Sequence, residues 1–274
     1  MTRVLSGLEL QGFIKERQAK QVRNLRQQYR IIPKLCIVMS DMAPQVINTY
    51  VRMKSAYASD ILIEVQVMAV SQQNMLAAIH TANEDTTIHG IIVQLPLDDP
   101  SQTDEICNSI VPHKDVDGLG ESATFPSATA EAIDWLLAGY NVELRAKRIT
   151  LLGHGRLVGA PLAKMWTARE LNVTVFDDKN STSDIHEALL QSDIIVSATG
   201  VPRILTADNV PTGAVVVDAG TASEGGVILG DVDESVRARN DVTITPAKGG
   251  VGPLTYTLLF DHLIQAALKT IEKT

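Results

Sequence analysis

The fold is decided by residues 148–159, which read Arg148-Ile149-Thr150-Leu151-Leu152-Gly153-His154-Gly155-Arg156-Leu157-Val158-Gly159. The first five residues are rich in β-formers, three glycines follow, and a helical pattern begins at Val158. Glycines at these places fit the strand–turn–helix that places a pyrophosphate on a helix N-terminus. Their spacing, G-x-G-x-x-x-G, is one residue longer than the usual fingerprint, so the turn alone indicates a class of cofactor.

Two later segments favour the same interpretation. A predicted strand over 173–176 ends at Asp177 and Asp178, where a carboxylate can accept hydrogen bonds from the ribose and would repel a 2′-phosphate. This favours NAD over NADP as cofactor, although both residues could instead cap the following helix or lie in solvent. A third strand ends in small residues that let backbone approach a flat cofactor. The predicted cofactor-binding residues are Gly153, His154, Gly155, Arg156, Gly159, Asp177, Asp178, Thr199 and Gly200.

Helices and strands alternate along the whole chain, which predicts an α/β fold with parallel sheets. A first helix is expected within residues 1–30, followed by strands over 34–39, 61–68 and 90–97 and helices over 44–58, 72–83, 103–109 and 130–138. A second series has strands over 149–153, 173–177, 194–197, 214–218 and 242–245, with helices over 158–169, 183–190, 233–239 and 253–273. We expect one domain of residues 1–128 plus 250–274 and a dinucleotide-binding domain of 129–249.

Composition limits the classes of function. The 274 residues are 45% hydrophobic and 20% charged with a net charge of −8, which argues against nucleic-acid and membrane-surface binding. No apolar stretch reaches membrane-spanning length, and the N-terminus lacks the apolar core of a signal peptide, so we expect a cytoplasmic protein. The two cysteines and six histidines show no metal-ligand spacing, so no metal is predicted.

Tyr50 and Lys54 lie four residues apart on a predicted helix and therefore share one face. A lysine beside a tyrosine hydroxyl can transfer protons if burial lowers its pKa, but most such pairs are surface contacts. Short-chain dehydrogenases also carry Y-x-x-x-K. In those enzymes the glycine motif comes first, whereas here it follows about a hundred residues later.

An ordered set of motifs resembles the methylenetetrahydrofolate dehydrogenase/methenyltetrahydrofolate cyclohydrolase family over nearly the whole chain. The motifs are Tyr50-Val51-Arg52-Met53-Lys54, Gly90-Ile91-Ile92-Val93-Gln94-Leu95-Pro96-Leu97, Lys114-Asp115-Val116-Asp117-Gly118, Val158-Gly159-Ala160-Pro161, Gly230-Asp231-Val232-Asp233 and a segment from Thr245 to Thr255 that includes Gly249-Gly250-Val251-Gly252-Pro253. Such an order is more specific than any single motif.

The resemblance implies an activity and roles for residues. Lys54 would drive the cyclohydrolase step, Tyr50 would stack on the folate, and Gln94 would tune Lys54. Asp117 would bind the pterin, and Gly252 and Pro253 would line the folate site. The implied reaction oxidises 5,10-methylenetetrahydrofolate with NAD(P) and hydrolyses the product to 10-formyltetrahydrofolate. The implied fold is two α/β domains flanking a cleft, the second a Rossmann-type parallel sheet, with the C-terminal helix returning to the first domain and a homodimer as the usual assembly.

The sequence departs from the family pattern at several places. Ile47 replaces a serine, Lys248 replaces a proline, and the loop after Gly118 is short. His154-Gly155 replaces Arg-Ser and Asp177-Asp178 replaces His-Ser, and both changes favour NAD. The changes on the folate side leave two alternatives open, a monofunctional dehydrogenase and a non-catalytic folate- or nucleotide-binding regulatory protein.

Overall fold

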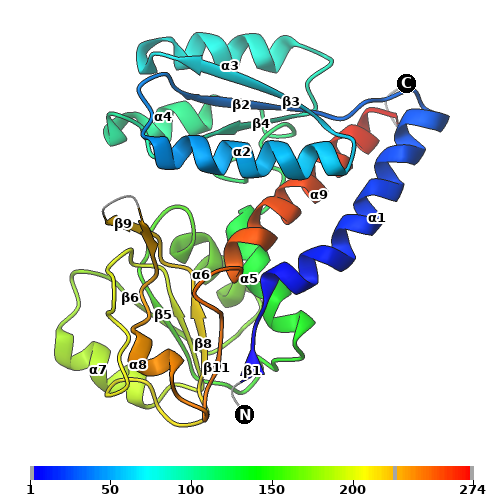
Figure 1. The fold of residues 1–274 in the computed structure, drawn as a ribbon. Helices are drawn as coiled ribbons and strands as arrows, with labels where there is room; N and C mark the ends of the chain where they lie inside the picture. Colours follow the sequence, from blue (N-terminus) through cyan, green and yellow to red (C-terminus); the bar gives the residue numbers. More distant parts are fainter. Residues whose placement is uncertain (1–2, 225–226, 272–274) are drawn as a thin grey trace. The chain divides into compact units, whose positions relative to one another are not determined.

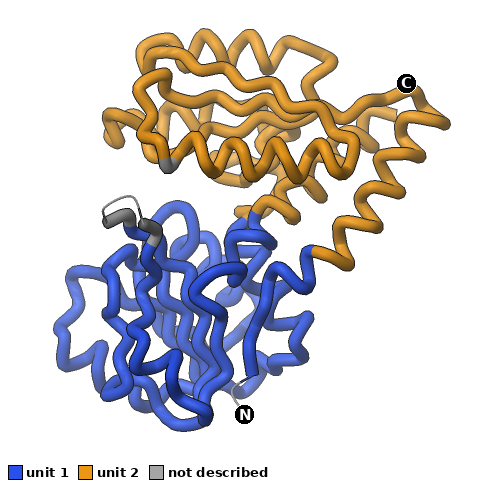
Figure 2. Tube along the Cα trace, viewed as in Figure 1, with its two compact units in different colours: residues 1–11, 129–255 blue, residues 12–128, 256–274 orange. Residues whose placement is uncertain are grey.

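The computed structural model describes residues 3–224 and 227–271 and divides the chain into two compact units (Figures 1 and 2). One unit contains residues 12–128 and 256–274, and the other contains residues 1–11 and 129–255. The expected domains differ from these units at two segments, 1–11 and 250–255. The first of these segments belongs to the nucleotide unit because strand β1 (Arg3–Val4) pairs with strand β11 (Thr243–Ile244).

The unit of residues 12–128 and 256–274 is built on a three-stranded parallel sheet in the order β3-β2-β4. Its strands are β2 (Lys34–Ser40), β3 (Glu64–Val70) and β4 (Gly90–Val93). Its helices are α2 (Gln45–Asp60), α3 (Met75–Glu84), α4 (Thr103–Asn108) and most of α1 (Gly7–Gln28) and α9 (Val251–Ile271), with short 3-10 turns η1 (Gln72–Asn74) and η2 (Pro100–Gln102).

The central strand β2 is buried on both faces, because successive side chains of a strand point to opposite sides of its sheet. Leu35 and Ile37 pack in one core with residues of α1, α2 and α9, while Cys36 and Val38 pack in another with residues of α3 and α4. This explains the continuous apolar run of the strand, which is typical of a parallel sheet covered by helices.

The other unit carries a six-stranded parallel sheet in the order β1-β11-β8-β7-β5-β6 (Figure 1). Its further strands are β5 (Ile149–Leu152), β6 (Val173–Phe176), β7 (Ile194–Ser197) and β8 (Val215–Asp218), and a hairpin is formed by β9 (Ala222–Glu224) and β10 (Val227–Leu229). Its helices are α5 (Ala128–Gly139), α6 (Gly159–Ala168), α7 (Thr182–Leu190) and α8 (Glu234–Arg237).

The two-domain α/β fold and the Rossmann-type sheet confirm the predicted fold class. Some expected elements are wrong in detail. Residues 61–63 close helix α2 and do not start β3, because Leu62 adopts a positive φ of 65°. Strand β4 ends at Val93 instead of extending to residue 97, and β1 and the β9–β10 hairpin were not predicted. The expected end of the last helix at residue 273 lies outside the described residues.

Lys114 closes the carboxyl end of helix α3. Its Nζ donates to the carbonyl oxygens of Ala82, Asn83 and Asp85 at 3.1, 2.8 and 2.8 Å, and the residue is only 7% exposed. The last carbonyl groups of a helix have no partner within the helix, so the ammonium supplies donors that the backbone lacks. Burial lowers the pKa of Lys114, and nearby Asp85 opposes this shift.

Replacement of Lys114 by methionine should lower the free energy of unfolding by about 2 kcal/mol, because one buried and two partly buried carbonyl groups would lose their donor. The same change at exposed Lys20 on α1 provides the control and should alter stability by less than about 0.5 kcal/mol. Urea unfolding measures both values. Equal effects of the two changes would show that the Lys114 contacts contribute nothing specific.

Candidate active site

The first half of the candidate site is a contact between Lys54 and Gln94. Lys54 lies on α2, and Gln94 is the first residue after β4, where its backbone N–H still donates to the carbonyl of Val38 at 2.8 Å. The Lys54 Nζ donates to Gln94 Oε1 at 2.7 Å. The structure therefore joins two predicted residues that are 40 positions apart in the sequence.

Asp117 is presented by a segment that extends the same sheet. Ile91 of β4 forms a parallel bridge with Asp115, and the Ile91 N–H donates to the carbonyl of Lys114 at 2.7 Å. Asp117 follows directly, so it leaves the sheet at the same carboxyl edge as Gln94. The buried carboxylate of Asp115 accepts from the N–H groups of Gly118 and Gly120 at 2.9 and 2.7 Å, which holds the turn after Asp117.

The loop after Asp117 is short, and its two ends are joined by a backbone hydrogen bond. Gly118 has a φ of 69°, and a Cβ at this position would lie 2.1 Å from the carbonyl oxygen of Pro126. The Ala128 N–H donates to the carbonyl oxygen of Asp117 at 3.0 Å, so the loop returns to its starting point. Only glycine fits at residue 118, because the loop needs both the left-handed backbone and the close approach.

The charges of Lys54 and Asp117 each shift the pKa of the other group. Burial lowers the pKa of the Lys54 amine, and the charge of Asp117 opposes that shift. Burial raises the pKa of Asp117 to about 6, with Lys54 opposing the rise. An amine with a lowered pKa beside a carboxyl with a raised one is a pattern found at acid–base sites.

Tyr50 lies one helical turn before Lys54 and is half-buried, and burial raises its pKa. Gly252 and Pro253 lie in the first turn of α9, in the residues assigned to the nucleotide unit. Gly252 is exposed and a Cβ there would meet no atom within 4 Å, whereas Pro253 is buried and its carbonyl accepts from Gln11 Nε2 at 2.8 Å. The predicted folate contacts of Tyr50, Gly252 and Pro253 stay predictions.

Sequence reasoning missed His262, which comes to Asp117 from helix α9. His262 is 2% exposed, its Nδ1 lies 2.9 Å from the carbonyl oxygen of Val116, and its ring stacks on Phe125 at 4.8 Å. Its charge lowers the pKa of Asp117. No local pattern marks this histidine, because it lies on an apolar helix far along the chain.

The glycine turn of the nucleotide unit has the packing expected of a dinucleotide-binding turn. Gly153 has a φ of 89°, and a Cβ there would lie 2.4 Å from the carbonyl oxygen of Ala198. A Cβ on Gly159 would lie 1.9 Å from the carbonyl oxygen of Gly153, so this glycine brings α6 against the strand. Gly155 is exposed and a Cβ there would meet nothing within 4 Å, which leaves its backbone open to a phosphate group. These residues fit a nicotinamide dinucleotide.

Asp177 directly follows strand β6 and lies beside the glycine turn, since the Gly153 N–H donates to the carbonyl of Phe176 at 2.8 Å. Its Oδ1 accepts from the Lys179 N–H at 3.0 Å, and the residue is half-buried. Asp178 and His154 are exposed, and Arg156 is half-buried. The place of Asp177 at the carboxyl end of β6 is where a Rossmann fold presents an acid to the adenosine ribose.

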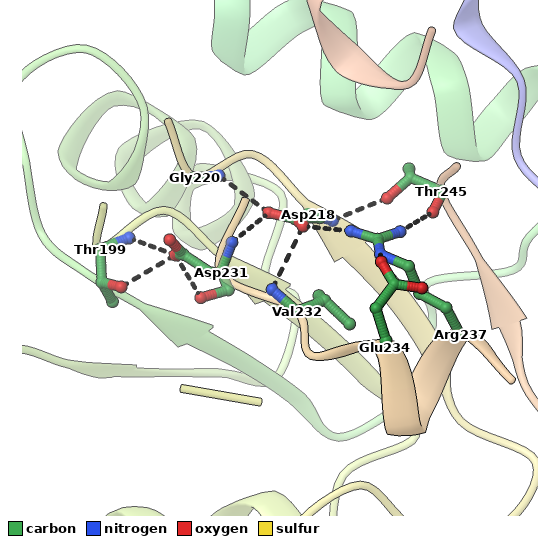
Figure 3. Close-up of polar contacts among 9 residues, drawn as sticks. Thr199, Asp218, Gly220, Asp231, Val232, Glu234, Arg237 and Thr245 are labelled. Atoms are coloured by element: carbon green, nitrogen blue, oxygen red, sulfur yellow. Dashed lines mark hydrogen bonds and ion pairs between the residues drawn. The ribbon is translucent and has the colours of Figure 1, made fainter. Parts of the chain in front are cut away.

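A buried pair of carboxylates lies at the carboxyl ends of β7 and β8 (Figure 3). Asp218 accepts from the N–H groups of Asp231 at 2.9 Å and Val232 at 3.2 Å and forms an ion pair with Arg237 at 2.6 Å. Asp231 is fully buried and accepts from both the N–H and the hydroxyl of Thr199 at 2.8 Å. The sequence marks Asp231 only as part of Gly230-Asp231-Val232-Asp233 and assigns it no role.

The described residues contain neither a membrane-spanning helix nor a metal-binding cluster of side chains. No helix in residues 3–224 and 227–271 is long and apolar enough to span a membrane. Over the same ranges, no three His, Cys, Asp or Glu side chains gather in a way that could hold a metal ion.

A Rossmann-type sheet with a glycine turn and a second α/β unit with a lysine–glutamine–aspartate set define a class of two-domain, dinucleotide-binding proteins. The tetrahydrofolate dehydrogenase/cyclohydrolase catalytic domain matches residues 5–117, and the NAD(P)-binding domain of the same family matches residues 127–271. The chain therefore belongs to the tetrahydrofolate dehydrogenase/cyclohydrolase family, which confirms the resemblance of its motifs.

Individual relatives agree over the full length. The bifunctional protein FolD of Streptococcus agalactiae is 32% identical over 286 residues, covering 99% of both chains. The crystal structure of the bifunctional FolD of Campylobacter jejuni is 32% identical, with a TM-score of 0.90 and coverage of 98% of this chain and 100% of that one. A FolD structure from Trypanosoma brucei, complexed with NADP and an inhibitor, is 28% identical with a TM-score of 0.90 and 98% coverage of each chain.

Proposed function

We propose that this chain oxidises 5,10-methylenetetrahydrofolate to 5,10-methenyltetrahydrofolate with a nicotinamide dinucleotide and then hydrolyses the product to 10-formyltetrahydrofolate. The observation that carries the proposal is the 2.7 Å contact between Lys54 and Gln94, next to Asp117, in a chain of this family. When bound, the dinucleotide supplies the hydride acceptor.

The side chains of this site have distinct proposed roles. Gln94 accepts from Lys54 and thereby orients the amine toward the carboxyl edge of the sheet. Burial favours the neutral form of Lys54, which can take a proton from the attacking water. Asp117 binds the pterin ring of the folate, because a carboxylate accepts hydrogen bonds from the N–H groups on the amino-pyrimidine edge of that ring. Tyr50 stacks on the folate, and Gly252 and Pro253 contact it from the start of α9.

The direct test measures methenyl absorbance and 10-formyltetrahydrofolate production from methylenetetrahydrofolate, with NAD and with NADP in parallel. Turnover in both steps supports the bifunctional enzyme. Oxidation without hydrolysis would replace it with a monofunctional dehydrogenase. Tight binding of folate and dinucleotide without any turnover would replace it with a regulatory binding protein.

We propose NAD as the preferred cofactor over NADP. The support is the half-buried Asp177 that follows β6, near Gly153, and the histidine, in place of an arginine, directly after that glycine. A carboxylate there accepts from ribose hydroxyls and repels a 2′-phosphate.

Replacement of Asp177 by serine should raise kcat/KM for NADP relative to NAD by about tenfold, because about 1.4 kcal/mol of repulsion is removed. Asp208→Ser, at an exposed aspartate of the same unit that is outside the predicted cofactor-binding set, is the control and should leave the ratio nearly unchanged. A wild-type protein that strongly prefers NADP would contradict the role given to Asp177.

The assembly and the location are also proposals. We propose a homodimer with a tetrahydrofolate derivative as the substrate, as the family resemblance implies. We also propose a cytoplasmic location, with neither nucleic acid nor membrane as a partner. The net charge of −8 supports the exclusion of nucleic acid and membrane surfaces as partners, because both are polyanionic and repel an acidic protein.

A further inference from the structure

We propose that Asp231 is a positioning residue for the nicotinamide end of the cofactor. Its buried carboxylate holds the turn of residues 199–201, which follows strand β7, in the shape that receives the nicotinamide riboside. The inference rests on the proposed function and adds a residue to it, because Asp231 stands outside the predicted cofactor-binding set.

Among the described residues, the hydrogen bonds of the Asp231 side chain converge on one oxygen atom. Oδ2 accepts from the Ser197 hydroxyl at 2.6 Å and from both the N–H and the hydroxyl of Thr199 at 2.8 Å. The Thr199 hydroxyl in turn accepts from the N–H of Val201 at 3.0 Å. One carboxylate oxygen therefore ties the last residue of β7 to the turn that follows it.

The turn needs such an anchor because its backbone leaves regular geometry. Gly200 has a φ of 69°, in the left-handed region, and the preceding Thr199 N–H donates to the Asp231 side chain instead of to a neighbouring strand. Hydrogen bonds to an ionised acceptor are roughly twice as strong as those between neutral groups. A fully buried carboxylate thus fixes the turn more firmly than water or a neutral side chain would.

The surrounding residues hold the Asp231 carboxylate itself in place. The backbone N–H of Asp231 donates to Asp218 Oδ1 at 2.9 Å, and Asp218 is paired with Arg237 (Figure 3). A Cβ on Gly220 would lie 1.9 Å from Asp231 Oδ1, and a Cβ on Gly230 would lie 2.1 Å from Asp218 Oδ2. Gly220 and Gly230 therefore leave room for the Asp231 and Asp218 carboxylates. Burying two carboxylates side by side is electrostatically unfavourable, which indicates that the turn of residues 199–201 does more than connect two elements.

The position in the sheet identifies which end of the cofactor is concerned. Strand β5 carries the glycine turn and lies between β6, with Asp177 at its end, and β7, with Thr199 after its end. A dinucleotide lies across the carboxyl ends of such strands with its pyrophosphate at the first turn. If the adenosine lies at the end of β6, the nicotinamide riboside lies on the other side of β5, at the ends of β7 and β8. There, Asp231 Oδ1 is buried without a hydrogen-bond partner among the described residues.

The experiment compares dissociation constants for NAD and for ADP, measured by titration calorimetry, because ADP lacks the nicotinamide riboside. Thr199→Val keeps the shape of the side chain but removes its hydrogen bonds with Asp231 and Val201. We expect it to weaken NAD binding about tenfold and ADP binding less than about twofold. Asp231→Ala should have a larger effect, and Asp231→Asn, which keeps an acceptor oxygen, should restore part of it.

Ser192→Ala is the matched control. Ser192 is buried just before β7 and forms a 2.6 Å hydroxyl contact with Thr150, so the variant loses a buried hydroxyl near the other end of the same strand. It should lower the melting temperature without changing the ratio of the two dissociation constants. Should Asp231→Ala fail to fold, Thr199→Val carries the comparison, because it retains the carboxylate and the Thr199 N–H contact.

The outcomes separate this inference from the proposed function. A wild-type protein that binds neither NAD nor NADP would refute the proposed function and this inference with it. A wild-type protein that binds NAD, with Thr199→Val and Asp231→Asn weakening NAD and ADP equally, would refute the positioning role alone. A loss confined to NAD, with partial rescue by Asp231→Asn, supports it.

Discussion

Replacement of Lys54 by alanine should slow hydrolysis of 5,10-methenyltetrahydrofolate by about 10²- to 10⁴-fold, the contribution typical of a positioned general acid or base. The reason is local: burial lowers the pKa of Lys54, and Gln94 Oε1 holds its Nζ at 2.7 Å, so the variant loses both the base and its orientation. Stopped-flow loss of methenyl absorbance measures the rate. Titration with NAD should show unchanged cofactor affinity, because Lys54 lies in the unit without the glycine turn.

Lys15→Ala is the control for this variant. Lys15 lies on α1 of the same unit, where it forms an ion pair with Asp60, so the change removes a lysine of equal size outside the site. It should leave hydrolysis within about twofold, since surface ion pairs contribute little. If the hydrolysis rate of Lys54→Ala matches that of the control, Lys54 does not act in this step.

Replacement of Gly159 by alanine should lower the melting temperature by about 5 °C and abolish measurable NAD binding. The added Cβ would lie 1.9 Å from the carbonyl oxygen of Gly153, so α6 and the turn must separate. Overpacking of this kind costs about 1–3 kcal/mol, and about 2–4 °C is lost per kcal/mol in a chain of this size. Calorimetric unfolding and NAD titration measure the two effects.

Gly155→Ala separates packing from binding in the same turn. Its Cβ would meet no protein atom within 4 Å and its φ is not positive, so the melting temperature should change little. NAD binding should still weaken by about tenfold, because the methyl group would stand where the backbone meets the pyrophosphate. Gly12→Ala, at an equally open position inside α1, should leave NAD binding unchanged and raise the melting temperature slightly, because alanine stabilises a helix interior relative to glycine. Equal melting temperatures for Gly159→Ala and Gly155→Ala would contradict the packing role of Gly159.

The limits of prediction from sequence follow from how local each signal is. Strand β2 was predicted closely because its apolar run is complete within seven residues. Strand β1 was missed because a two-residue strand has no periodicity and is defined only by its pairing with β11. The start of β3 was placed too early because Ile61 and Ile63 are β-branched and buried, although they close helix α2.

By itself, the sequence determined the alternation of helices and strands, the glycine turn at 153–159, and the shared helix face of Tyr50 and Lys54. These depend on spacing within one or two elements. Only the tertiary structure decided that Lys54 meets Gln94, that His262 approaches Asp117, and that Asp231 binds Thr199. The physical reason is that contacts across elements depend on strand order and on how helices pack, and neither is encoded in any local pattern of residues.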